Sequence, residues 1–129
     1  MGGGRAILTP TTVVDPETGT NGRRLDGKDL INQWLAEHTN GAYVTTRDEL
    51  LNLDVATTDS ILGTYNTLKL IGFYNSRDFH NLGLFSPSHM EFFLESETAN
   101  NPTLEEMTRK AIEMLQKETN GYVLLVEGV

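Results

Sequence analysis

Glu127 is the residue whose type and position point most directly to chemistry, because its carboxylate follows an unbroken apolar run over residues 122–126. A strand with one face in water would alternate apolar and polar residues, so the unbroken run predicts a strand buried on both faces, as in parallel sheets. Ligands of open α/β sheets bind beyond the carboxyl ends of such strands. We therefore expect a functional site to gather at Glu127.

A helix is predicted directly before this strand. Thr103 and Glu106 have the spacing of a capping box, in which each side chain accepts from a first-turn amide. One helical face then carries Leu104, Met107, Ala111, Met114 and Leu115. Asn120-Gly121 is expected to end the helix, because glycine tolerates the left-handed conformation common at helix ends.

The rest of the chain alternates between predicted helices and strands. A Gly/Thr-rich stretch over residues 2–27 is expected to be mostly loop, apart from a short apolar piece at residues 6–8. A helix is predicted over residues 28–37, a strand over 42–45, a second capping box at Thr46 and Glu49, and a strand over 60–63. This alternation favours the α/β class.

Four blocks resemble the alkaline phosphatases of animals, insects included, and they occur in the family's order. They are MGGGR at residues 1–5, NGRRLDGKDL with WLA between residues 21 and 36, LGLFSPSHM at residues 82–90, and TRKAIEMLQK with NGYVLLVEG between residues 108 and 128. The resemblance covers residues 1–63 and 82–129. It implies that residues 1–129 are an incomplete alkaline phosphatase domain, a partial segment of a three-layer α/β fold with a central, mostly parallel sheet.

The resemblance implies hydrolysis of phosphate monoesters at alkaline pH through a phosphoserine intermediate, with two zinc ions and one magnesium ion. Only Glu127 matches a family ligand of these metals, the carboxylate that binds magnesium, and hard cations do favour carboxylate oxygen. The family's nucleophilic serine and zinc ligands correspond to positions outside residues 1–129. No catalytic residue is therefore assigned, and we expect this segment to be inactive alone. The parent enzyme would be a homodimer, secreted or lipid-anchored at the cell surface.

Some vertebrate members also bind a structural calcium ion. The matching positions are Glu17, the carbonyl of Phe85, Ser86 and Asn101. Because Ser86 and Asn101 are not acids, no calcium site is expected.

About twenty residues, 64–83, separate blocks that are contiguous in the family. Gly63 can be encoded with an internal GT, and Leu82-Gly83 with an AG border. We therefore interpret residues 64–83 as an insert, a translated intron by hypothesis; a surface loop is the alternative, since loops tolerate insertion at small entropic cost.

Composition excludes several classes of function. A net charge of −8 with scattered basic residues argues against nucleic-acid and anionic-membrane binding. No cysteine is present, so no thiolate metal site is possible, and neither a signal-peptide pattern nor an apolar run of membrane-spanning length occurs. The alternative to a phosphatase segment is a non-catalytic binding or dimerising protein, because an apolar strand left uncovered would invite pairing.

Other polar residues are assigned structural roles. The glycines of residues 2–4 lack the Lys-Ser/Thr ending of a phosphate-binding loop, so a turn is expected there. His38 is expected at a helix C-terminus and His89 in a loop hydrogen bond, whereas His80 falls in the insert and has no role assigned. Arg109 and Lys110 are expected to pair with glutamates of their own helix rather than to bind phosphate.

Overall fold

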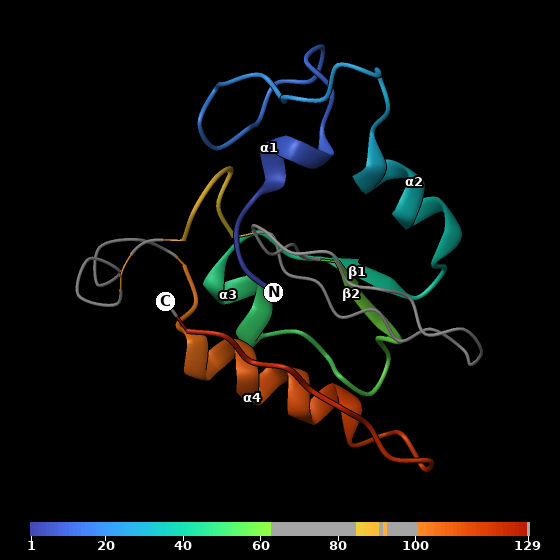
Figure 1. Ribbon diagram of the computed structural model, residues 1–129. Coiled ribbons are helices and arrows are strands. Elements are labelled where there is room, and N and C mark those ends of the chain that lie inside the picture. Colours follow the sequence, from blue (N-terminus) through green and yellow to red (C-terminus); the bar gives the residue numbers. More distant parts are fainter. Residues whose placement is uncertain (63–84, 91, 93–100, 129) are drawn as a thin grey trace.

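The computed structural model describes residues 1–62, 85–90, 92 and 101–128. The predicted insert, including His80, lies outside the described residues. Figure 1 shows a mixture of helix and strand, consistent with the predicted α/β class. The order of elements is α1 (Arg5–Leu8), α2 (Leu30–Glu37), β1 (Gly41–Tyr43), α3 (Arg47–Leu51), β2 (Ser60–Leu62) and α4 (Leu104–Leu115).

The predicted helices form where their caps are encoded. Asp29 is the N-cap of α2, and its carboxylate accepts from the amide of Asn32 at 3.0 Å. The capping box that opens α3 is complete, with Thr46 and Glu49 each bonded to the other's backbone amide. A side-chain cap of this kind contributes about 1 kcal/mol. Thr46 and Glu49 confirm the predicted capping box, which depends on nothing distant in the chain. The Asp29 cap was not predicted, and α2 begins at Leu30 rather than at residue 28.

The two strands β1 and β2 pair in parallel, with Ala42 opposite Ile61, and α3 lies in the connection between them. The strands predicted over residues 42–45 and 60–63 are confirmed in place: β1 begins and ends earlier than predicted, and β2 covers residues 60–62 of the described chain. Figure 1 shows this pair between α2 and α4.

The main core joins α3, β2, α4 and the segment that contains Phe85. Four side chains are almost completely buried: Phe85, Leu50, Ile61 and Met114. Burial of each such side chain stabilises the fold by roughly 1.5–3 kcal/mol. A smaller cluster is centred on Ile31, which packs with Leu8, Trp34, Leu35 and Tyr43. The apolar faces predicted for the helices thus form two distinct clusters.

Helix α4 ends earlier than predicted. Its last residue is Leu115, and the next amides close shorter turns, with Glu118 donating to the Leu115 carbonyl at 3.0 Å. Gly121 does adopt the expected left-handed conformation, with φ +83°, but it lies beyond the helix end. Turns of this kind satisfy the last carbonyls of a helix, so the chain leaves α4 before Asn120-Gly121.

The predicted strand over residues 122–126 is wrong for the described part of the chain. Those residues are extended but assigned to no strand, and Val123 and Leu125 are 96% and 84% exposed. A strand needs a neighbour for its backbone amides and carbonyls. Among the described residues the sheet holds β1 and β2 alone. An apolar run therefore indicates that a segment can form a buried strand, but it does not show that the neighbouring strands are present to bury it.

Candidate functional site

Glu127 lies in the extended segment that doubles back along α4. Figure 1 shows this segment beside the helix, and a Cβ added to Gly128 would lie 3.2 Å from a methyl carbon of Leu104 at the start of α4. Val126 also lines a shallow hollow on α4 with Leu104. Glu127 itself is exposed. The structure thus places the candidate ligand at the surface, at the end of a segment held by few contacts.

The described residues do not fit a metal centre. Among them, no group of three or more His, Asp or Glu side chains converges on one point. Magnesium prefers octahedral coordination by oxygen and is usually bound by one or two carboxylates together with waters and substrate phosphates. Glu127 is one carboxylate, and within the described residues it belongs to no such group of ligands.

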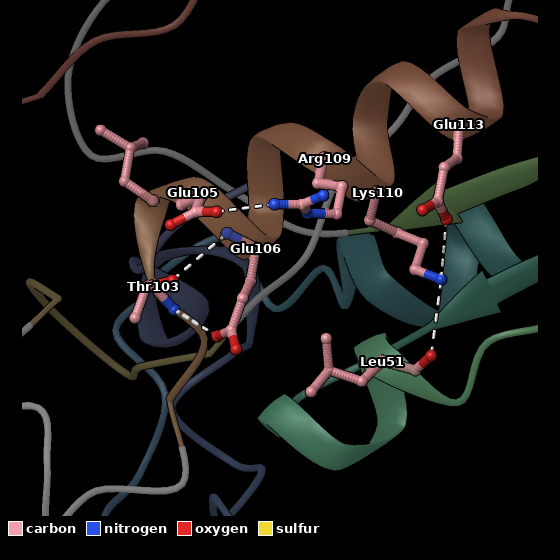
Figure 2. Close-up of a pocket in the computed structure, with 8 residues that line it drawn as sticks. Leu51, Thr103, Glu105, Glu106, Arg109, Lys110 and Glu113 are labelled. Carbon is pink, nitrogen blue, oxygen red and sulfur yellow. Dashed lines mark hydrogen bonds and ion pairs between the residues drawn. The ribbon is translucent and has the colours of Figure 1, made fainter.

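A second candidate is the open hollow of about 680 Å³ between α3 and the first turns of α4. Figure 2 shows its lining side chains, several of them charged. Arg109 pairs with Glu105 at 2.7 Å, and the ammonium of Lys110 lies 3.1 Å from Glu113 and 3.4 Å from the Leu51 carbonyl. Both cations thus have carboxylate partners on α4 itself.

The prediction that Arg109 and Lys110 pair with glutamates of their own helix is thus confirmed, but Lys110 also reaches α3, which was not predicted. Lys110 is only 9% exposed. Its stem lies against α3, and its ammonium reaches a backbone carbonyl of that helix. Long basic side chains bury their methylenes in this way while keeping the charge near polar partners.

The strongest charge pair of this region joins the two helices. The Arg47 guanidinium donates from Nε to both carboxylate oxygens of Glu106, each at 3.0 Å. Glu106 also accepts from the Thr103 amide at 2.9 Å as part of the predicted capping box. The hydrogen bond from Arg47, aided by that from Thr103, lowers the pKa of Glu106 from 4.5 to about 2, although partial burial acts in the other direction. Sequence reasoning assigned Glu106 to pairs within α4 and missed this partner.

The glycine-rich N-terminal segment uses its amides for structure. Gly4 donates to the Ser88 carbonyl at 2.6 Å, and Ala6 to the Pro87 carbonyl at 3.1 Å. A Cβ on Gly3 would lie 2.0 Å from the Ser88 carbonyl oxygen, so close backbone approach requires glycine there. The Gly4 and Ala6 amides are therefore occupied by backbone carbonyls of the segment that contains Ser88.

Arg5 is the most deeply buried charge of the described chain, only 3% exposed. Its guanidinium donates to Asp15 at 3.0 Å and also pairs with Glu17. Burial would lower the pKa of Arg5, but the hydrogen bonds to these two carboxylates outweigh it and raise that pKa. Burial likewise opposes the ionisation of Asp15, but the Arg5 hydrogen bond and backbone amides hold its pKa below the usual value. This cluster anchors the loop after α1, and sequence reasoning did not identify it.

The other positions considered for calcium also have protein partners. Glu17 faces Arg5, and the Ser86 hydroxyl donates to the His89 carbonyl at 2.7 Å.

His38 lies at the C-terminus of α2, as predicted: its Nδ1 is 2.8 Å from the Trp34 carbonyl, and its ring stacks on that indole. The bond from Ser86 engages the His89 backbone, so the predicted loop hydrogen bond of the His89 side chain stays a prediction. No helix within the described residues has the length and apolar character needed to cross a bilayer.

Comparison of the sequence with known proteins finds a matching family and similar proteins. The family model described as alkaline phosphatase matches residues 1–78 and 66–129. A membrane-bound alkaline phosphatase of Bombyx mori is 36% identical over 99% of this chain and 20% of its own length. The alkaline phosphatase of Gadus morhua is 32% identical over 99% of this chain and 24% of its own. The tissue-nonspecific isozyme of Gallus gallus is 36% identical over 99% and 22% respectively. The chain spans roughly a fifth to a quarter of these relatives.

Proposed function

The chain belongs to the alkaline phosphatase family, and on that premise we propose that it supplies one segment of an enzyme that hydrolyses phosphate monoesters. The observation that carries the proposal is similarity along almost the whole chain to several such enzymes. The segment itself would be inactive, since neither nucleophile nor zinc ligand is assigned within it. The parent enzyme would act as a homodimer at the cell surface; the Bombyx mori relative is named membrane-bound.

Within that enzyme, Glu127 would contribute one carboxylate to a magnesium site. When bound, magnesium and the two zinc ions would supply charge stabilisation for phosphoryl transfer. The described residues do not fit the complete group, so among them Glu127 alone would contribute a ligand. Other parts of the enzyme would have to supply the remaining ligands.

Placement of Glu127 would depend on completing the central sheet. In the proposed three-layer fold, residues 122–126 form a strand flanked by others in a mostly parallel sheet. The support is the exposure of this apolar segment: Val123 and Leu125 present nearly their whole side chains to solvent. Covering both faces would bury them and fix the carboxylate at the strand's end.

Residues 64–83 would be an insert in an otherwise incomplete alkaline phosphatase domain, translated from an unspliced intron. The two family matches overlap within this stretch, which supports an interruption there. Sequencing the gene and its transcripts tests the origin. Absence of GT and AG borders would eliminate the intron and leave the alternative, a surface loop.

The inactivity of the segment is tested by expressing residues 1–129 and measuring hydrolysis of a chromogenic phosphate monoester at alkaline pH. Zinc and magnesium are added, and a circular dichroism spectrum is recorded on the same sample. We expect no metal-dependent turnover. Turnover that disappears on chelation would overturn the proposal and require a different nucleophile within the chain.

The role of Glu127 is tested in a chimera in which residues 101–128 replace the matching segment of the Bombyx mori enzyme. We expect the chimera to hydrolyse the ester and Glu127→Gln to lose activity, with partial recovery at raised magnesium. Glu118→Gln is the matched control, because Glu118 lies in the turn before the segment. Equal activity of the two variants would eliminate Glu127 as a ligand.

An alternative function is non-catalytic self-association through residues 122–126, favoured by the same exposed apolar side chains. Sedimentation of the chain at several concentrations separates the two. A dimer abolished by Leu125→Lys would support the alternative, whereas a monomer would remove it.

A further inference from the structure

The tripeptide Thr-Asn-Gly occurs three times, with asparagine at positions 21, 40 and 120. In an Asn-Gly pair the glycine amide nitrogen can attack the asparagine side-chain carbonyl, since glycine has no side chain to hinder the approach. The local sequence is the same at all three places. Any difference in reactivity between them must therefore come largely from the fold.

The first copy is held by hydrogen bonds on both reacting groups. The Asn21 side-chain amide donates to the Thr11 carbonyl at 2.6 Å, and the Gly22 amide donates to the Val13 carbonyl at 2.9 Å. Gly22 is buried, and its Cα lies so close to the Thr9 carbonyl that a Cβ would be 2.3 Å from the oxygen. Neither group can move without breaking this packing.

The second copy is held in the same way. The Asn40 side-chain amide donates to Asp59 at 2.7 Å, and the Gly41 amide donates to the His38 carbonyl at 2.9 Å. Gly41 is also the first residue of β1, where it pairs with Ser60. Its nitrogen is therefore fixed by a turn and a strand together.

The third copy has neither constraint. Asn120 and Gly121 are exposed, and neither the Asn120 side chain nor the Gly121 amide makes a hydrogen bond of ordinary geometry with any described residue. Gly121 has φ +83°, and no atom lies within 4 Å of the place a Cβ would occupy. This pair forms the joint between α4 and the loosely held segment that ends at Glu127, so its backbone can rotate into the geometry that attack requires.

We propose that Asn120 is a site of spontaneous deamidation, specified by the fold rather than by its local sequence. The Gly121 amide nitrogen forms a bond to Cγ of Asn120, the bond from Cγ to the side-chain nitrogen breaks, and ammonia leaves with the proton from Gly121. The product is a five-membered cyclic imide. Water then opens either carbonyl, giving aspartate or isoaspartate and one additional negative charge. In isoaspartate the main chain is one methylene longer at the start of the segment beside α4.

The test is peptide mapping by mass spectrometry after incubation of residues 1–129 at mildly alkaline pH. Attack at Asn21 or Asn40 requires loss of two hydrogen bonds, so we expect Asn120 to react more than about tenfold faster than either. The same incubation in concentrated urea should bring the three rates together. Asn120→Gln should remove the main acidic charge variant of the native sample.

Two results would overturn the proposal. One is a native rate at Asn21 or Asn40 equal to that at Asn120. The other is a preference for Asn120 that persists unchanged in urea, because the preference would then arise from sequence further along the chain and not from the folded structure.

Discussion

Replacing Glu106 by glutamine tests the charge pair that links α3 to α4. Glutamine keeps the shape of the side chain and can still occupy the third position of a capping box with Thr103, so the change isolates the interaction with Arg47. The shift of the Glu106 pKa from 4.5 to about 2 sets the upper limit of its contribution. That limit is about 3 kcal/mol. Because the Arg47 side chain is 44% exposed, solvent screening reduces the expected loss to about 1 kcal/mol.

The pH dependence has a definite sign. The pKa of Glu106 is lower in the folded chain than in the unfolded chain, so its stabilising effect is complete above the unfolded value of 4.5 and is lost as pH falls toward 2. More than half of the effect should be gone by about pH 3. The free energy of unfolding of the glutamine variant should therefore change less over this range than that of the unmodified chain.

The measurement is urea unfolding followed by circular dichroism at neutral pH and at two acidic values. Glu105→Gln is the matched control on the same helix, because Glu105 is 78% exposed and its partner Arg109 is 69% exposed. Such a pair contributes about 0.3–0.5 kcal/mol. An equal loss from both substitutions, or identical pH profiles for Glu106→Gln and the unmodified chain, would refute the reasoning.

Three further substitutions, with Leu125→Ala as an exposed control, test the packing and the buried ion pair, each by urea unfolding. Gly3→Ala should cost more than about 2 kcal/mol, because its Cβ would lie 2.0 Å from the Ser88 carbonyl oxygen; an unchanged midpoint would refute the close approach. Met114→Ala should cost about 2–5 kcal/mol at a side chain that is 1% exposed, whereas Leu125→Ala should stay within about 0.5 kcal/mol. Asp15→Asn should cost about 3 kcal/mol by leaving a buried guanidinium without its main partner, and a loss below that of Leu125→Ala would contradict this.

The parts of the fold that could be predicted are those encoded within a few residues. The capping boxes at Thr46 and Thr103 were predictable because the cap and its partner lie three residues apart. Contacts between distant segments were not: Arg47 and Glu106 are 59 positions apart, and nothing in either local sequence selects the other. Burial of Lys110 was missed for the same reason, since it depends on where α3 packs.

The candidate site likewise has a part that the local sequence predicted and a part that depends on distant segments. The residue type and position of Glu127 were readable from the sequence, and the resemblance assigned it a metal. Its surroundings were not readable, because a strand's burial depends on neighbours that lie elsewhere in sequence. The erroneous strand and the isolated carboxylate therefore have a single physical cause.

The lack of neighbouring strands also gives a reason to expect that residues 122–126 become ordered once a sheet surrounds them. Val123 and Leu125 are almost fully exposed, and burying two such side chains would release roughly 3–6 kcal/mol. Against this stands the conformational entropy lost by ordering the segment, about 1–2 kcal/mol per residue before strand hydrogen bonds form. The two terms are of similar size, so hydrogen bonds to flanking strands would decide the balance. Glu127 would then become fixed only together with the sheet. Hydrogen exchange should accordingly show unprotected amides at residues 122–126 in this chain and protected ones in the chimera with the Bombyx mori enzyme, whereas protection in the isolated chain would contradict this account.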